Sequence, residues 1–140
     1  RALELKRLRE SLTLENLSTD ALTGGYPLEF KLRLKDPRQA VEAMRVHYRK
    51  EDQGDFSALA LKPDIQGFWQ ATLPGEWTEN EAGLAVDYFI STHDKAETFL
   101  VGLGQKDALQ HIRIQPGTVA DTIAFYEKNI FGRQPLGWRS

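Results

Sequence analysis

One stretch with a strict two-residue period, residues 83–94 (GLAVDYFISTHD), constrains the fold more than any other part of the chain. Its large apolar side chains share one side of the period: Leu84, Val86, Tyr88 and Ile90. The other side carries Ala85, Asp87, Phe89 and Ser91. Alternation of aromatic and β-branched residues with smaller or polar ones predicts a β-strand with one face in a core. We expect the other strands to be arranged around this one.

The same period recurs along the chain. It is clearest in residues 27–35, where Leu28, Phe30, Leu32 and Leu34 alternate with charged residues. Further strands are predicted at residues 41–50, 56–61, 68–73, 97–103 and 111–115, with a weak edge strand at 13–17. Turn signals such as Asp36-Pro37, Pro74-Gly75 and Pro116-Gly117 separate them. About seven to eight short strands at this spacing predict a mainly β fold, an antiparallel β-sandwich.

Both ends of the chain change to a helical period. Residues 1–12 place Leu5, Leu8 and Leu12 on one face, which predicts a short amphipathic helix. Near the other end, Thr118 can cap a helix with Asp121 three positions on. The apolar stripe of that helix is Val119, Ile123, Tyr126 and Ile130, and Gly132 ends it. We expect the helix to pack on the sandwich, because Phe125 and Phe131 widen its apolar face; the alternative is a linker that leads into the next element. The predicted organisation is an N-terminal helix or linker (1–20), a sandwich (21–116), and a C-terminal helix and tail (117–140).

Composition narrows the functional classes. The 140 residues carry a net charge of −2, so the overall balance does not favour binding to nucleic acid. There is no cysteine, which excludes disulfides and thiolate metal sites. No apolar run approaches the roughly 20 residues that a membrane-spanning helix needs. The chain starts at Arg1, and we expect it to be a processed chain or a segment of a longer protein.

Four segments carry a family resemblance: PLEFKL (27–32), MRVHYR (44–49), GFWQATLPG (67–75) and residues 83–94. Their order resembles the immunoglobulin-like or fibronectin-III-like modules of bacterial envelope proteins. The resemblance implies an immunoglobulin-like sandwich in an accessory domain with a periplasmic or other extracytoplasmic location; a cytoplasmic location stays open. Such modules usually have a glycine just after the Asp of the 83–94 strand, whereas Lys95, Ala96 and Glu97 follow Asp94 here.

Catalytic and metal chemistry find little support. His47, His93 and His111 are candidate metal ligands with Asp94, but we expect their strand parities to keep them off a common surface. Ser57 or Ser91 would need a Gly-x-Ser-x-Gly elbow or a glycine-rich oxyanion loop, and the sequence has neither. We therefore expect no cofactor, no metal and no enzymatic activity. A small hydrolase remains the third functional hypothesis.

The candidate binding residues lie on two basic strands and one acidic loop: Lys31, Arg33, Arg45, His47, Arg49, Glu76, Trp77 and Glu79. If the two basic strands were neighbours, they would form a positive stripe suited to an acidic partner. The alternative is that the alternating charge only discourages edge pairing. Trp77 is either a lid on the core or a binding platform. Trp69 and Tyr88 are expected in the core. Phe89, on the outer parity of its strand, is expected under a terminal helix, and the alternative is an exposed contact patch.

These observations favour a non-catalytic protein-interaction or positioning domain of a larger bacterial envelope protein. Its partner would be another protein or another domain of the parent chain. The alternative is a carbohydrate-binding module in which a sugar stacks on Trp77, helped by Tyr26 or Phe99.

Overall fold

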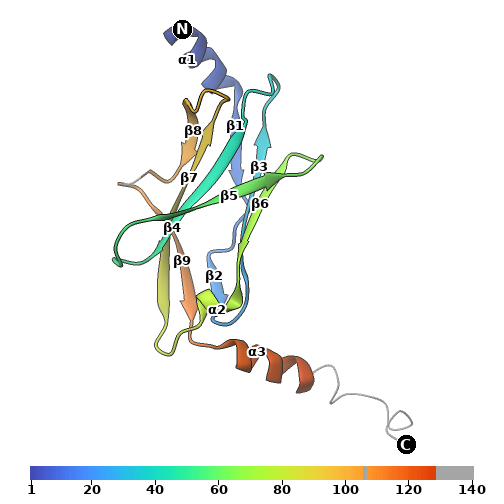
Figure 1. Ribbon diagram of the computed structural model, residues 1–140, viewed down its shortest axis with the longest axis vertical. Coiled ribbons are helices and arrows are strands. Elements are labelled where there is room, and N and C mark those ends of the chain that lie inside the picture. Colours follow the sequence, from blue (N-terminus) through green and yellow to red (C-terminus); the bar gives the residue numbers. More distant parts are fainter. Residues whose placement is uncertain (106, 129–140) are drawn as a thin grey trace, which may run out of the picture.

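The computed structural model describes residues 1–105 and 107–128, which form nine strands and three short helices (Figure 1). In chain order these elements are α1 (Ala2–Ser11), β1 (Thr13–Asn16), β2 (Ala21–Thr23), β3 (Leu28–Lys35), β4 (Ala43–Lys50), β5 (Ser57–Pro63), β6 (Phe68–Leu73), α2 (Gly75–Thr78), β7 (Leu84–His93), β8 (Phe99–Leu103), β9 (Gln110–Gln115) and α3 (Val119–Tyr126).

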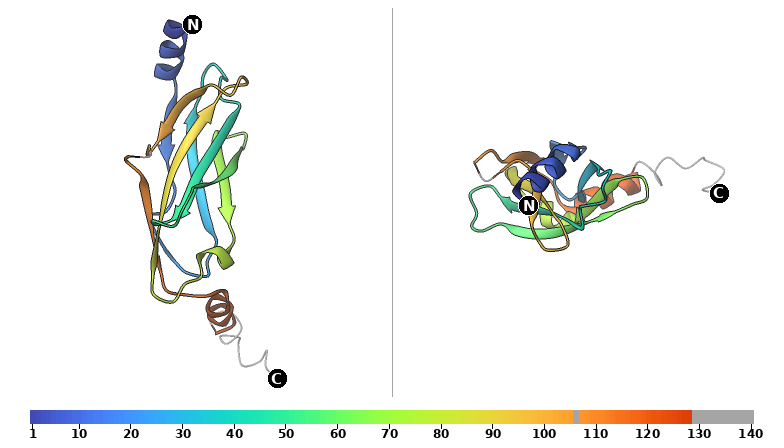
Figure 2. Two further views of the ribbon diagram at one scale, coloured as in Figure 1. Left: turned by 60° about the vertical axis from the view of Figure 1, so that its left-hand side comes forward. Right: turned by 90° about the horizontal axis from the view of Figure 1, so that it is seen from above.

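The strands form two layers that share β5 (Figure 2). Sheet A contains β1, β3, β6 and the end of β5, and sheet B contains the start of β5, then β4, β7, β9 and β2, with β8 beside β7. Ser57 to Leu61 pair with β4, whereas Lys62 and Pro63 pair with β6, so β5 turns the corner between the sheets. Grouping the first, third and sixth strands apart from the fourth, seventh and ninth is the order of an immunoglobulin-like sandwich.

The inward side chains of both sheets form one core, as the two-residue period predicts. Its fully buried members include Phe30, Leu32, Val46, Val86, Ile112 and Ile114. The predictions for Trp69 and Tyr88 are confirmed, because they are only 8% and 2% exposed. The Tyr88 ring meets Phe30 edge to face, with ring centroids 5.1 Å apart. Burial raises the pKa of the Tyr88 phenol, although its hydrogen bond from Asn16 acts in the opposite direction.

β7 is the central strand of sheet B, in agreement with its role as the organising stretch. One side of β7 pairs with β4 along eight residues of each strand. The other side pairs first with β9 and then with β8. The register with β8 shifts between Ser91 and His93. There the buried Thr92 hydroxyl donates to the Val101 carbonyl oxygen (2.7 Å) and accepts from the Val101 N–H (3.0 Å), which replaces regular ladder bonds.

The weak edge strand expected at residues 13–17 is present as β1, which pairs with β3 at the edge of sheet A. One strand differs from the sequence-based expectation. β2 was not predicted, and it brings the described strands to nine rather than seven or eight. It has only three residues, and its partner β9 runs parallel to it from about 90 positions further along the chain. Such a short segment carries no period of its own, and only the distant partner defines it.

The two terminal helices relate differently to the sandwich. α1 docks on it, since Leu5 and Leu8 pack against the core. In addition, Arg9 donates from Nε to the Leu100 carbonyl oxygen (2.9 Å) and from Nη2 to that of Phe99 (2.7 Å). These bonds cover the outer edge of β8, which would otherwise be open to pairing with another strand. No described helix is long and apolar enough to cross a membrane.

The prediction that the C-terminal helix packs on the sandwich is wrong for its described part. The capping box of Thr118 and Asp121 is present, yet none of the residues of α3 is buried. α3 instead leaves from the end of the molecule opposite to α1 (Figure 1). That end is already closed by α2, whose buried Thr78 hydroxyl accepts from the Gly25 N–H and donates toward the Tyr26 carbonyl oxygen. The predicted contributions of Ile130, Phe131 and Gly132 lie outside the described residues.

Candidate functional site

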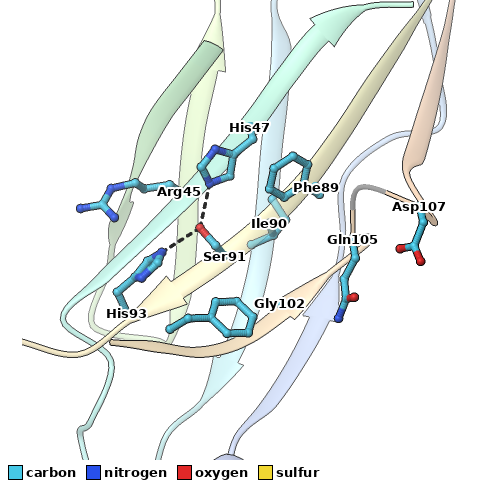
Figure 3. Close-up of a pocket in the computed structure, with 10 residues that line it drawn as sticks. Arg45, His47, Phe89, Ile90, Ser91, His93, Gly102, Gln105 and Asp107 are labelled. Carbon is cyan, nitrogen blue, oxygen red and sulfur yellow. Dashed lines mark hydrogen bonds between the residues drawn. The ribbon is translucent and has the colours of Figure 1, made fainter. Parts of the chain in front are cut away.

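A hollow of about 540 Å³ opens on the outer face of sheet B and is the best-formed candidate site. It lies over β4, β7 and β8 and the loop that follows β8 (Figure 3). The register explains why these side chains meet, because His47 is paired with Phe89 and Arg45 with Ser91. Paired residues of antiparallel strands point to the same side. Ten residues line the hollow: Arg45, His47, Phe89, Ile90, Ser91, His93, Phe99, Gly102, Gln105 and Asp107.

One wall of the hollow is aromatic. The His47 and Phe89 rings stack with centroids 4.4 Å apart and planes 9° apart, and Phe56 meets Phe89 edge to face at 5.2 Å. Across the hollow, Phe99 is 43% exposed, which is unusual for so large an apolar side chain. Gly102 leaves room beside it, because a Cβ at that position would lie 3.1 Å from the Phe99 ring. The wall therefore offers apolar surface that the described residues leave uncovered.

The floor is polar and centres on one hydroxyl. Ser91 Oγ lies 2.8 Å from His47 Nε2 and 3.0 Å from His93 Nε2, and Ser91 is only 6% exposed (Figure 3). A hydroxyl has one proton to donate and two lone pairs, so at least one of the two imidazoles must donate to Ser91. His93 Nδ1 is buried without a hydrogen-bond partner among the described residues. A buried N–H without a partner is rarer than a buried lone pair without one. This favours His93 donating from Nε2 to Ser91, which leaves the Ser91 proton available for a bond to His47 Nε2.

The rim carries a forked ion pair between Arg45 and Glu97. The two guanidinium nitrogens lie 3.0 and 3.1 Å from the two carboxylate oxygens. The hydrogen bond between them raises the pKa of the Arg45 guanidinium, and the same bond lowers the pKa of the Glu97 carboxyl group. Glu97 is a non-glycine residue with a φ of +62°, in the tight turn between β7 and β8.

A second polar cluster lies beside the hollow, at the opposite end of β7. Asp87 is 3% exposed and accepts from Arg49 Nε (3.3 Å), and its other oxygen lies 2.9 Å from His111 Nδ1. The Arg49 guanidinium also lies 4.4 Å from the centre of the Phe56 ring. Because Phe56 touches Phe89, the two clusters join through aromatic contacts into one network across the face.

The two predicted basic strands do not form one stripe. β6 and β5 separate β3 from β4 in the strand order, so Lys31 and Arg33 lie on sheet A while Arg45, His47 and Arg49 lie on sheet B. On sheet A the side chains of Lys31 and Arg33 lie over the Phe68 ring, at 4.7 and 4.8 Å from its centre. The condition for a positive stripe is therefore not met.

The third predicted group lies at the far end of the molecule, in and after α2. Trp77 packs partly against the core and meets Tyr48 edge to face at 5.4 Å, and the Lys50 ammonium lies 5.1 Å from its ring centre. These contacts favour the lid interpretation over a sugar platform. Glu79 accepts from the Val119 N–H (2.7 Å) at the start of α3, and Glu76 is exposed. The predicted loop begins as a short helix, because Pro74 leads directly into α2.

Two expectations about this face are wrong. The three histidines do share a surface, because His47, His93 and His111 all point outward from sheet B. Phe89 lies against His47 and Phe56 rather than under a helix. Both errors arise from judging each strand alone, since pairing determines which outward residues meet. Among the described residues no cluster of three or more His, Asp or Glu side chains has the geometry to hold a metal ion.

Sequence reasoning named Arg45 and His47 as binding residues. It considered Ser91, His93 and Phe99 only in other roles, as a nucleophile, a metal ligand and a sugar contact, and it expected Phe89 elsewhere. It gave no site role to the remaining members, Ile90, Gly102, Gln105 and Asp107. A usable signal was present: the outward parity of residues 83–94 includes Phe89 and Ser91, and the same parity extends to His93. The residues from β8 and its following loop had no such signal.

Comparison with known proteins gives limited relationships. No family model matches the chain, and no curated protein matches it. Among solved structures, it is similar to the CARDB domain of the PF1109 protein from Pyrococcus furiosus, which was solved in complex with di-metal ions. The match has 14% sequence identity and a TM-score of 0.38, and covers 76% of this chain and 94% of that one. The fold assignment rests on the strand order and register described above.

Proposed function

We propose that this domain is a non-catalytic interaction and positioning module of a larger extracytoplasmic protein. The observation that carries the proposal is the placement of α1 and α3 at opposite ends of the long axis (Figure 1). Because the chain enters the sandwich at one end and leaves it at the other, the sandwich can separate the neighbouring domains or proteins by its own length. The sequence resemblance to bacterial envelope modules supports the extracytoplasmic setting.

The surface of α3 supports an interaction at that end. Ile123, Phe125 and Tyr126 are 54%, 53% and 50% exposed, although all three are large and apolar or aromatic. An exposed cluster of this kind marks a contact surface more often than a solvated one. The proposed partner of α3 is another domain of the parent chain or another protein bound next to it.

The serine–histidine arrangement gives the strongest reason to consider catalysis, and its details argue against it. A nucleophilic serine needs a base whose second ring nitrogen is oriented by a carboxylate or a similar group. His93 Nδ1 has no such partner among the described residues, so His93 does not fit the role of that base. Ser91 lies within a ten-residue strand rather than on a sharp turn, so it also lacks the elbow geometry.

Site-specific photo-crosslinking in the full-length protein tests the proposal. A photoreactive residue placed at Ile123 should form crosslinks to a neighbouring domain or protein. Ile65 is the matched control, because it is fully exposed in the turn between β5 and β6, which lies far from α3 (Figure 1). Equal yields at the two positions, or none at either, would contradict the positioning role. Labelling of Ser91 by a fluorophosphonate would contradict the non-catalytic assignment.

A further inference from the structure

The hollow on sheet B has the dimensions and lining of a small-ligand site. Its volume of about 540 Å³ falls within the roughly 300–1,000 Å³ typical of ligand pockets. Such pockets combine apolar and aromatic walls with a few polar groups that converge on one place. Here the walls are Phe99 and the His47–Phe89 stack, Ser91 and His93 lie together at the floor, and the Arg45 side chain extends to one side, away from Phe89 (Figure 3).

The chemistry at the rim indicates what charge the ligand carries. The Arg45 fork already holds a carboxylate, that of Glu97, through two contacts of 3.0 and 3.1 Å. A planar guanidinium matches a carboxylate in this geometry better than it matches any neutral group. The Glu97 side chain is 62% exposed and that of Arg45 is 32% exposed, so the pair is open to exchange with a carboxylate from solution.

The backbone at Glu97 supports a role for its side chain. With φ at +62°, Glu97 adopts the left-handed conformation that glycine adopts without strain. A residue other than glycine there costs free energy, and such strain tends to persist where the side chain is needed. In this structure the Glu97 side chain places a carboxylate on Arg45, which is one of the residues that line the hollow.

We propose that the hollow binds an aromatic carboxylate, with its ring against Phe99 and the His47–Phe89 stack and its carboxylate in the place of Glu97 on Arg45. 3-Phenylpropionate, a phenyl ring joined to a carboxylate by two methylene groups, is a simple probe that carries both parts of this ligand. Glu97 then acts as an internal competitor that the ligand must displace.

This proposal is independent of the positioning role, because ligand binding and crosslinking at Ile123 are separate measurements. The test is a titration of the ¹⁵N-labelled domain with 3-phenylpropionate, followed by NMR shifts of the Ser91 and Gly102 amides. We expect saturable shifts at millimolar concentration, and weaker binding by about tenfold for 3-phenylpropionamide, which lacks the charge. Equal binding of acid and amide, or no shifts at these amides, would overturn the proposal.

Two pairs of variants sharpen the test. Glu97→Gln removes the competitor and keeps the size of the side chain, so affinity for 3-phenylpropionate should rise by about threefold or more. Arg45→Gln should lower it by about tenfold. The matched controls are Glu15→Gln and Arg33→Gln, because Arg33 and Glu15 form an ion pair of 3.6 Å on sheet A. An affinity that Glu97→Gln leaves unchanged or lowers would contradict competition by Glu97 and overturn the proposed binding mode.

The ligand could be a free acid or the end of a polypeptide, and one further comparison separates these sources. A tripeptide ending in phenylalanine is titrated with its C-terminal carboxylate free and then amidated. If the peptide with a free C-terminal carboxylate binds and the amidated peptide does not, the hollow accepts a chain terminus as well as small acids. Binding of 3-phenylpropionate without either peptide assigns it to small acids. In both cases the Arg45→Gln variant should abolish the preference for the charged form.

Discussion

The two outer faces of the sandwich share a sequence pattern of alternating basic residues but form different surfaces. β3 and β4 both place basic residues at alternate positions: Lys31, Arg33 and Lys35 on one, Arg45, His47 and Arg49 on the other. On sheet A, β3 lies between β1 and β6, and its basic side chains lie over Phe68 or pair with the exposed Glu15. On sheet B, β4 lies beside β7, which supplies Asp87, Phe89 and Ser91.

The partner strand therefore determines whether an outward-facing basic residue is exposed or held in contacts. Arg33 and Lys35 are exposed, whereas Arg45, His47 and Arg49 are half-buried in contacts with β7 and its following turn. Exposed ion pairs such as Arg33–Glu15 contribute about 0–1 kcal/mol to stability. Hydrogen-bonded charges that are out of water contribute more and leave a larger deficit when one partner is removed.

Removing the Asp87 side chain should give the largest difference in stability between the two faces. Asp87→Ala takes away the acceptor of both Arg49 and His111 at a position that is 3% exposed. We expect the free energy of unfolding to fall by about 2–3 kcal/mol, measured by urea denaturation. Glu15→Ala on sheet A is the matched control and should change it by less than about 0.5 kcal/mol. Equal losses in the two variants would show that the faces do not differ in this way.

Removing the Ser91 hydroxyl should have the next largest effect. Ser91→Ala leaves both His47 Nε2 and His93 Nε2 without the oxygen that joins them. A loss of about 1–2 kcal/mol is expected, since imidazole nitrogens that are partly out of water would lose a hydrogen bond. The corresponding change on sheet A is Thr72→Ala, at an exposed outward position of β6, with an effect within about 0.5 kcal/mol. NMR of the imidazole nitrogens would report the change directly, and unchanged ring signals in Ser91→Ala would contradict the shared hydroxyl.

The smallest expected effect is on the response to acid. Arg45 lowers the pKa of the Glu97 carboxyl below its usual 4.5, and the Thr98 N–H is the main cause that lowers that of Asp94 below 3.8. A carboxyl with a lowered pKa in the folded state stabilises the fold above its unfolded pKa, and this stabilisation is lost as the pH falls through the folded value. The free energy of unfolding, measured from neutral pH to about pH 3, should therefore decrease once the pH is lower than 4.5.

The matched variants identify the source of that acid response. Arg45→Gln should weaken the dependence below pH 4.5, because Glu97 then regains a more usual pKa. Arg33→Gln should leave it as in the unaltered protein. If the free energy of unfolding depends on pH in the same way in both variants, Glu97 is not the carboxylate responsible for the acid response.

Much of the fold could be predicted from the sequence because its signals are local. Alternation in residues 27–35 and 83–94 defined two strands with their inward faces, and Thr118 with Asp121 defined the start of α3. The position of α3 could not be predicted in the same way. Its apolar stripe shows that the helix has a contact face, but only the three-dimensional arrangement shows that α2 already closes this end of the sandwich.

The candidate site was less predictable because it depends on pairing between distant segments. His47 and Ser91 are 44 positions apart, and they meet because Arg45 is in register with Ser91 on the neighbouring strand. The hollow also needs Gly102 and Phe99 from β8, whose register with β7 shifts at this point. The alternating pattern indicates which residues face outward, but it does not indicate which outward residues become neighbours.

The most direct test of the difference between the two faces is a map of 3-phenylpropionate-induced NMR shifts over all backbone amides of the unaltered domain. The shifts should concentrate on β4, β7 and β8 around Ser91 and Gly102, and leave Lys31, Arg33 and Phe68 on sheet A unchanged. Shifts that are spread evenly over both sheets, or centred on Phe68, would contradict the account. In that case the hollow on sheet B would be a feature of packing rather than a binding site.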